Sequence, residues 1–143
     1  MISFNTLDVM MPSFSVDQIR AWIVSVVEAQ GREVGELHYV FCSDDALLRI
    51  NQDRLGHDFY TDIVTFPLND CEKVISSEFC ISLDRVAENA LCYRRDFLDE
   101  LFRVMIHGVL HLIGFDDQDE ASVVRMRAME DDCLKLLQQI DCQ

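Results

Sequence analysis

The segment "DFLDELFRVMIHGVLHLIGFDD", residues 96–117, decides how the rest of this sequence is interpreted. Around His107 and His111 the side chains are apolar on nearly every side of a helix, which is the pattern of a helix at the centre of a domain. The two histidines are four residues apart, so they project from the same helical face. Gly114 allows the backbone to leave the helix and turn back, and Asp117 follows. The segment therefore predicts a central helix that ends at a polar site.

The spacing of these polar residues predicts a metal site. The pattern H-x3-H-x5-D matches the spacing of the metzincin zinc motif. Two imidazoles and a carboxylate form a known catalytic zinc set that leaves a position for water, although other metals also accept it. Zinc proteases carry a general-base glutamate directly after the first histidine, and here that residue is Gly108, which disfavours such peptidase chemistry. We predict that His107, His111 and Asp117 hold one ion, with Asp116 as an alternative to Asp117.

The whole chain suits one domain spanning residues 1–143, because this length buries a real core and is short for two domains. No apolar stretch approaches the roughly 20 residues that span a bilayer, and no secretory signal is visible. The six cysteines form no C-x-x-C pair, so we expect reduced thiols in the cytoplasm. Cys80 and Cys133 fall on apolar stripes and are expected in the core.

The net charge of −14 limits how the chain could bind nucleic acid. A protein that grips many phosphates should be locally basic. RNA binding would therefore need a local basic patch or a partner that presents the RNA. The acidity could equally serve only to keep the protein soluble.

Hydrophobic periodicity and capping residues predict an α+β domain. Ser15, Ser43 and Asp96 are predicted helix caps. The predicted strands cover residues 2–6, 36–42, 61–67 and 78–83, and the predicted helices cover residues 15–31, 43–55, 84–95, 96–113 and about 118–140. The pattern does not predict the order of the strands.

Three sequence blocks resemble the YbeY family of single-domain, metal-dependent endoribonucleases that act in ribosomal RNA maturation. The family signature H-G-x-L-H-L-x-G-[YF]-x-H matches "HGVLHLIGFDD" at every position but the last. An asparagine followed by T-D-[VI]-[LIV]-[ST]-F occurs as "NQDRLGHDFYTDIVTF", residues 51–66. The block G-D-I-x-I-S occurs weakly as "SEFCIS", residues 77–82. The blocks keep the family's order from about Leu37 to Glu130.

The resemblance implies a small mixed four-stranded sheet with about five or six helices, and the metal site at the end of a central helix. It implies a single-strand-specific endoribonuclease in 16S rRNA 3′-end processing and ribosome quality control, using one Zn²⁺ per chain. The implied partners are rRNA, the small ribosomal subunit and ribosome-biogenesis proteins, with no membrane or DNA. Two alternatives stay open: a non-catalytic small-subunit assembly factor with a structural metal, and a metallohydrolase of another substrate.

Three departures from the family pattern bear on the site. Most members have histidine where this chain has Asp117. The family arginine falls on Leu55, with Arg54 one residue earlier and His57 two later. A helical side chain shifted by one residue turns by about 100°, so either residue is only a candidate for the catalytic, phosphate-stabilising role. The G-D pair is replaced by residues 77–78, Ser-Glu.

The remaining candidates are polar residues near these blocks. Asp62 could orient a ligand histidine or cap a turn. His38 fits no pattern and is treated as a bystander. A basic run before the metal helix could bind substrate, or could be a solvated, salt-bridged face; it comprises Arg85, Arg94 and Arg95, with Arg103 beside them.

Overall fold

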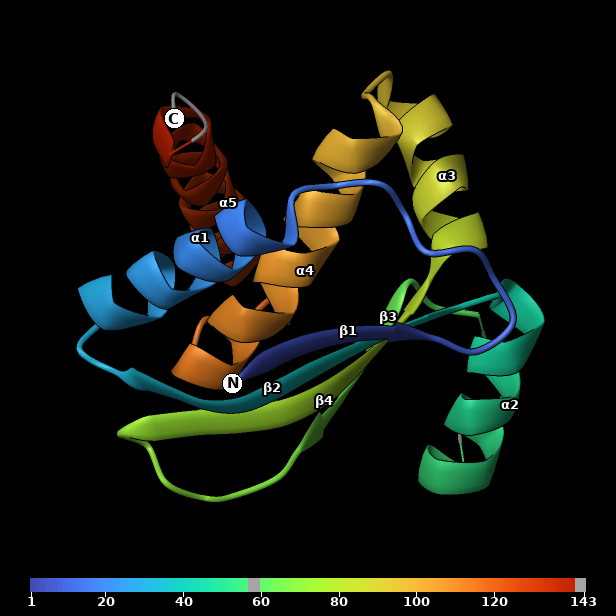
Figure 1. Cartoon of the computed structure of the whole chain (residues 1–143), viewed down its shortest axis with the longest axis horizontal. Helices are drawn as coiled ribbons and strands as arrows, with labels where there is room; N and C mark the ends of the chain where they lie inside the picture. Colours follow the sequence, from blue (N-terminus) through green and yellow to red (C-terminus); the bar gives the residue numbers. More distant parts are fainter. Residues whose placement is uncertain (57–59, 141–143) are drawn as a thin grey trace.

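The computed structural model describes residues 1–56 and 60–140, and in them four strands form one mixed sheet (Figure 1). The order is β1-β2-β4-β3, with β1, β2 and β4 parallel and β3 antiparallel to β4. This confirms the predicted α+β class with a four-stranded mixed sheet. The strands are β1 (Ile2–Thr6), β2 (Glu33–Cys42), β3 (Ile63–Pro67) and β4 (Val74–Ser82), and the helices are α1 (Val16–Ala29), α2 (Asp44–Leu55), α3 (Leu83–Tyr93), α4 (Phe97–Ile113) and α5 (Glu120–Ile140).

Local capping sets the helix bounds largely as predicted. The hydroxyls of Ser15 and Ser43 accept hydrogen bonds from the amides of Gln18 and Ala46 at the starts of α1 and α2. Asp96 does stand at the cap position of α4, but its side chain makes no capping hydrogen bond. Gly114 ends α4 with a φ of 121°, a backbone conformation that a side chain would disfavour.

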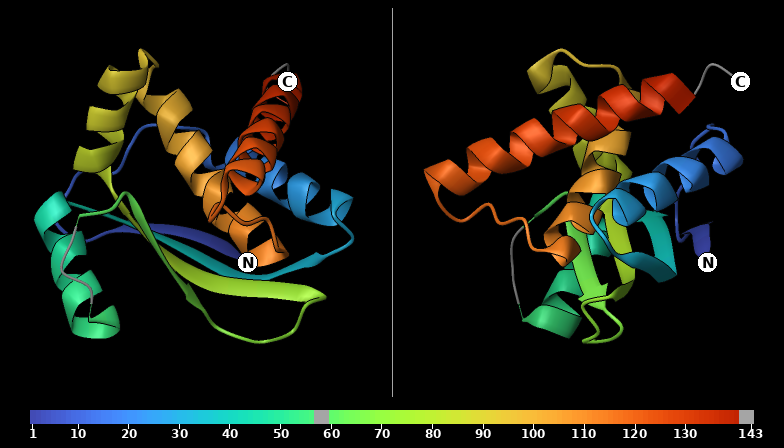
Figure 2. Two further views of the ribbon diagram at one scale, coloured as in Figure 1. Left: turned by 180° about the vertical axis from the view of Figure 1, so that it is seen from behind. Right: turned by 90° about the vertical axis from the view of Figure 1, so that its left-hand side faces the viewer.

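The two faces of the sheet are covered differently. Alternate β2 residues Leu37, Tyr39 and Phe41 join the main core beneath α1, α4 and α5. Figure 2 shows α1 and α5 packed together on one side of α4, with α3 on the other side. On the opposite face, α2 covers a smaller buried cluster that includes Leu47 and Val64. The candidate ligands His107 and His111 lie on α4, and are therefore on the face with the main core.

A close approach fixes α4 above β3 and β4. A Cβ placed on Gly108 would lie 2.8 Å from Cε1 of Phe79 and 2.9 Å from Cδ1 of Ile63. Side chains essentially never approach so closely, so this position needs glycine. Gly108 thus brings the two histidines that flank it down onto the edge of the sheet.

The two cysteines that were predicted to lie in the core are buried in the structure. Cys80 and Cys133 are buried and free, as predicted, while Cys142 lies outside the described residues. Among the helices of residues 1–56 and 60–140, none combines the length and apolar character required to cross a bilayer.

Candidate metal centre

A cavity of about 640 Å³ opens at the edge strand β3 and holds the predicted ligands. His107 and His111 reach it from α4, and Asp117 reaches it from the loop after Gly114. The structure thereby brings the three residues to one cavity. Residues from α2 and the start of β3 complete the wall, among them Asn51, Leu55, Thr61, Asp62, Ile63 and Thr65.

His107 is held between two carboxylates. Its Nδ1 lies 2.7 Å from Oε2 of Glu130, and its Nε2 lies 3.5 Å from Oδ2 of Asp117. A carboxylate accepts hydrogen bonds only, so Nδ1 donates to Glu130. A neutral ring with its proton on Nδ1 presents a lone pair at Nε2, on the side of Asp117. This is the arrangement in which histidine commonly binds a metal.

Glu130 is a functional candidate that sequence reasoning missed. It lies on α5, is only 5% exposed, and accepts a 2.9 Å hydrogen bond from Nη1 of Arg103. Nη2 of Arg103 donates to Asp131 at 2.6 Å, which fixes the guanidinium. The sequence did carry a signal: Glu130 falls in line with the buried Met126 and Cys133 on the apolar face of α5. A carboxylate within such a stripe requires a buried partner.

Burial and the neighbouring charges act on the pKa of His107 in opposite directions. Burial would lower the pKa of His107, but the hydrogen bond and charge of Glu130, with Asp117 and Asp62, raise it overall. Burial raises the pKa of Asp62, and the nearby His107 partly offsets that rise. Asp62 accepts a 3.4 Å hydrogen bond from Nδ2 of Asn89. The Asp62 carboxylate therefore lies close enough to His107 to influence its pKa.

The donors present are chemically suited to a divalent ion such as zinc. Two atoms that each lie about 2.1 Å from a tetrahedral zinc are separated by about 3.4 Å. The 3.5 Å between Nε2 of His107 and Oδ2 of Asp117 fits that separation. Across residues 1–56 and 60–140, however, no three His, Cys, Asp or Glu side chains already stand together as a complete ligand group. A complete site requires side-chain movement, which is available because His111 and Asp117 are both exposed.

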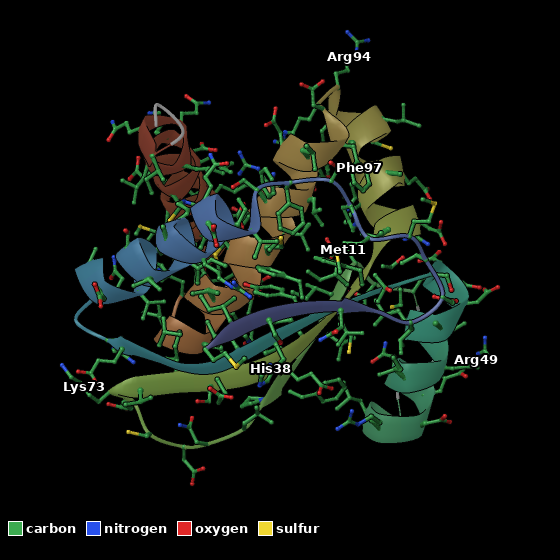
Figure 3. The ribbon with its side chains drawn as sticks, in the orientation of Figure 1. Met11, His38, Arg49, Lys73, Arg94 and Phe97 are labelled. Carbon is green, nitrogen blue, oxygen red and sulfur yellow. The ribbon has the colours of Figure 1, made fainter. Side chains whose placement is uncertain are left out.

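Asp116 and His38 are not placed as ligands. Oδ1 of Asp116 accepts a 2.7 Å hydrogen bond from the amide of Asp117, which turns its carboxylate back onto the backbone. His38 lies on β2, where its Nδ1 is 2.6 Å from Oγ of Ser3 (Figure 3). Asp117 is therefore the acid that faces His107.

The structure does not bring Arg54 to this cavity. Its guanidinium lies 4.1 Å from the ring centroid of Phe66 and 3.4 Å from Oε1 of Glu78. Phe66 belongs to the cluster beneath α2, so Arg54 is on the sheet face opposite the histidines. Leu55, one residue later in α2, lines the cavity instead. The other candidate, His57, lies outside the described residues.

Most of the basic run is paired with carboxylates. Arg85 pairs with Asp44 and Glu88, and Arg95 pairs with Glu100. Arg94 caps α3 in a left-handed conformation and extends from the tip of the molecule (Figure 3). Of the four predicted substrate-binding arginines, Arg54, Arg85, Arg94 and Arg95, only Arg95 lines a hollow shared with His107. Arg103, the remaining member of the basic run, lines the same hollow.

The comparisons with known proteins agree with this geometry. The profile of the family described as Endoribonuclease YbeY matches residues 5–138. The chain belongs to the YbeY endoribonuclease family. It is 42% identical to the Endoribonuclease YbeY of Phocaeicola vulgatus, covering 96% of this chain and 99% of that protein. It is 40% identical to that of Porphyromonas gingivalis, covering 96% and 91%. A solution structure from Thermotoga maritima matches with a TM-score of 0.70 at 26% identity, covering 96% and 89%.

The departures from the YbeY pattern now have places in the structure. Asp117, at the third ligand position, faces His107. Leu55, at the position where the resemblance implied an arginine, supplies an apolar part of the cavity wall. Ser77, in the weak third block, is buried and donates to the carbonyl of Phe66 at 3.1 Å, while Glu78 pairs with Arg54. Two of the three departures thus alter the cavity itself, and the third lies on the strand beneath it.

Proposed function

We propose that this chain is a metal-dependent endoribonuclease that acts in ribosomal RNA processing. The activity is the one that its family name carries. One observation of this structure supports it most strongly: Glu130 holds Nδ1 of His107, so that Nε2 is presented to Asp117 at the separation of two ligands on one ion. We propose His107, His111 and Asp117 as the ligands and zinc as the metal.

The protein's own residues would prepare the site for phosphodiester cleavage. When bound, the metal acts as a Lewis acid, which can activate water or polarise a phosphoryl oxygen. Glu130 keeps the proton of His107 on Nδ1, and Arg103 holds the Glu130 carboxylate in place. Asp62 adds a half-buried carboxyl group beside His107, which we propose helps to hold the ring. We leave Arg54 out of the mechanism because of its placement, and keep His57 as a predicted catalytic residue.

We propose single-stranded RNA at the 3′ end of 16S rRNA as the substrate, and the cytoplasm as the location. The net charge of −14 and the pairing of Arg85 and Arg95 with carboxylates leave little free positive charge. This favours RNA that is presented by the small ribosomal subunit and its biogenesis proteins over RNA gripped by this chain alone.

Replacing His111 with alanine tests the proposal. We expect His111→Ala to lose bound zinc, measured by mass spectrometry, and cleavage of a 16S precursor, while circular dichroism and melting temperature stay near those of the wild type. His38→Ala is the matched control, because His38 lies on another strand away from the cavity. Cleavage that persists in His111→Ala would contradict the proposal.

One observation favours a second function, that of a non-catalytic assembly factor. Leu55 lines the cavity where the family arginine would supply charge to a phosphate. In that case the metal would serve structure, and His111→Ala would lower the melting temperature markedly. Wild-type protein loaded with zinc would then bind the small subunit without cutting its RNA.

A further inference from the structure

A second hollow, of about 240 Å³, continues from the candidate metal centre between α3, α4 and α5. Asp62, His107 and Asp117 line both this hollow and the cavity at β3. The metal centre is therefore the wall that the two hollows share. A polymer whose reacting bond lay at His107 would extend from one hollow into the other.

The second hollow contains three arginines with different surroundings. Arg95 pairs with Glu100 at 2.9 Å, and Arg103 pairs with Glu130 and Asp131. Arg127 lies on α5, is exposed, and has no carboxylate within ion-pair distance among residues 1–56 and 60–140. Its positive charge is therefore available to an anion that enters the hollow.

An exposed aromatic ring lies near two of these arginines. Tyr93, the last residue of α3, is 52% exposed and also lines the hollow. The guanidinium carbon of Arg95 lies 5.0 Å from the centroid of its ring, and that of Arg127 lies 6.0 Å away. The two guanidinium groups place positive charge beside the ring, which favours an anionic ligand there.

We propose that Tyr93 and Arg127 form a subsite for one nucleotide of a single-stranded RNA, next to the nucleotide cut at the metal centre. The base stacks on the ring of Tyr93, and Arg127 contacts the adjoining phosphate. Arg95, held by Glu100, keeps the ring in place. This inference rests on the proposed endoribonuclease function and adds to it the way in which the substrate strand is held.

The chemistry of the pair matches single-stranded RNA better than a duplex. Stacking on an aromatic side chain needs a base that is unpaired and turned outward, which a duplex does not offer. Every base has a planar face, so stacking on Tyr93 holds a strand without regard to sequence. A subsite of this kind also explains how an acidic chain can bind RNA, since stacking does not depend on net charge.

Binding of a cleavage-resistant oligoribonucleotide by the zinc-loaded protein tests the subsite. The probe is a fluorescent, 2′-O-methyl phosphorothioate single strand of about ten nucleotides, within the site sizes usual for such proteins. Fluorescence anisotropy gives the Kd for wild type, Tyr93→Leu, Tyr93→Phe and Arg127→Ala. Arg49→Ala is the control, because it removes the same charge from a side chain that extends outward from α2 (Figure 3).

The subsite predicts a distinct pattern across these variants. Tyr93→Leu should weaken binding by about 5- to 100-fold, the range for loss of one stacked base, while Tyr93→Phe keeps wild-type affinity. Arg127→Ala should weaken binding and reduce the slope of log K against log salt by roughly 0.7, the value for one phosphate on a single strand. Arg49→Ala should change neither quantity.

The outcomes separate the subsite from the proposed function. If the wild type cleaves RNA but Tyr93→Leu binds the probe like the wild type, the subsite is overturned and the function stands. If Arg127→Ala and Arg49→Ala weakened binding of the probe equally, Arg127 would act only through the overall charge of the protein. Its assignment to the subsite would then be overturned. A wild-type protein that neither binds the probe nor cleaves precursor RNA presented in the small ribosomal subunit would overturn both proposals.

Discussion

The two faces of the sheet carry charged residues in very different ways. On the α4 face, His107 is fixed by Glu130, which is itself held by Arg103, and these residues are partly or fully buried. On the α2 face, Arg54 lies over Phe66 and pairs with Glu78 at the surface. Buried charges need hydrogen-bonded partners, whereas a surface ion pair costs and contributes little. The comparison teaches that a functional histidine can be identified by the buried, hydrogen-bonded residues that hold its ring.

The strongest test of this comparison removes the charge of Glu130. We expect Glu130→Gln to weaken zinc binding by about 10- to 100-fold, the usual effect of losing a carboxylate that orients a ligand histidine. The measurement is zinc affinity by competition with a chromophoric chelator, with the melting temperature as a check on folding. If zinc affinity were unchanged, Glu130 would serve only to pair with Arg103.

Glu100→Gln is the matched control for that test. Glu100 is a second buried glutamate, and it pairs with Arg95 at 2.9 Å in the same way that Glu130 pairs with Arg103. Its carboxylate bonds to no histidine in the described part of the chain. We expect its replacement to lower stability without changing zinc affinity.

The next test concerns the close approach that seats α4 on the sheet. We expect Gly108→Ala to lower the free energy of unfolding by about 1–3 kcal/mol, because the added methyl group would meet Phe79 and Ile63. Urea denaturation measures this loss. Ile63→Val removes one of the three close atoms and should recover part of this loss. If Gly108→Ala left the free energy of unfolding unchanged, α4 would be able to move away from β3 without cost.

The smallest effect is expected on the α2 face. Arg54→Ala should slow cleavage by less than about 5-fold, since a surface ion pair is worth roughly 0.2–1 kcal/mol. Leu55→Arg, which places a guanidinium where the cavity wall is, should speed cleavage instead. Steady-state rates on one RNA substrate compare the two variants. A large loss of cleavage rate in Arg54→Ala would mean that the Arg54 side chain moves away from Glu78 and acts at the cavity.

Much of the fold and part of the site could be predicted from local sequence. Ser43 begins α2 and Gly114 ends α4, because caps and glycine turns depend on neighbouring residues only. His107 and His111 share a face because helix geometry alone requires it. The turn at Gly114 likewise predicted that Asp117 would approach the histidines, and the structure brings all three to one cavity. Their role as metal ligands stays a prediction.

The tertiary structure alone decided which partners these residues have. The order β1-β2-β4-β3 and the seating of α5 against α4 bring Glu130, 23 residues away in sequence, to within 2.7 Å of His107. The same packing turns Leu55 toward the cavity and Arg54 to the other face of the sheet. Helix periodicity fixes the angle between two side chains of one helix. Only the packing of that helix against the sheet decides which of them faces the site, because that choice depends on contacts between segments distant in sequence.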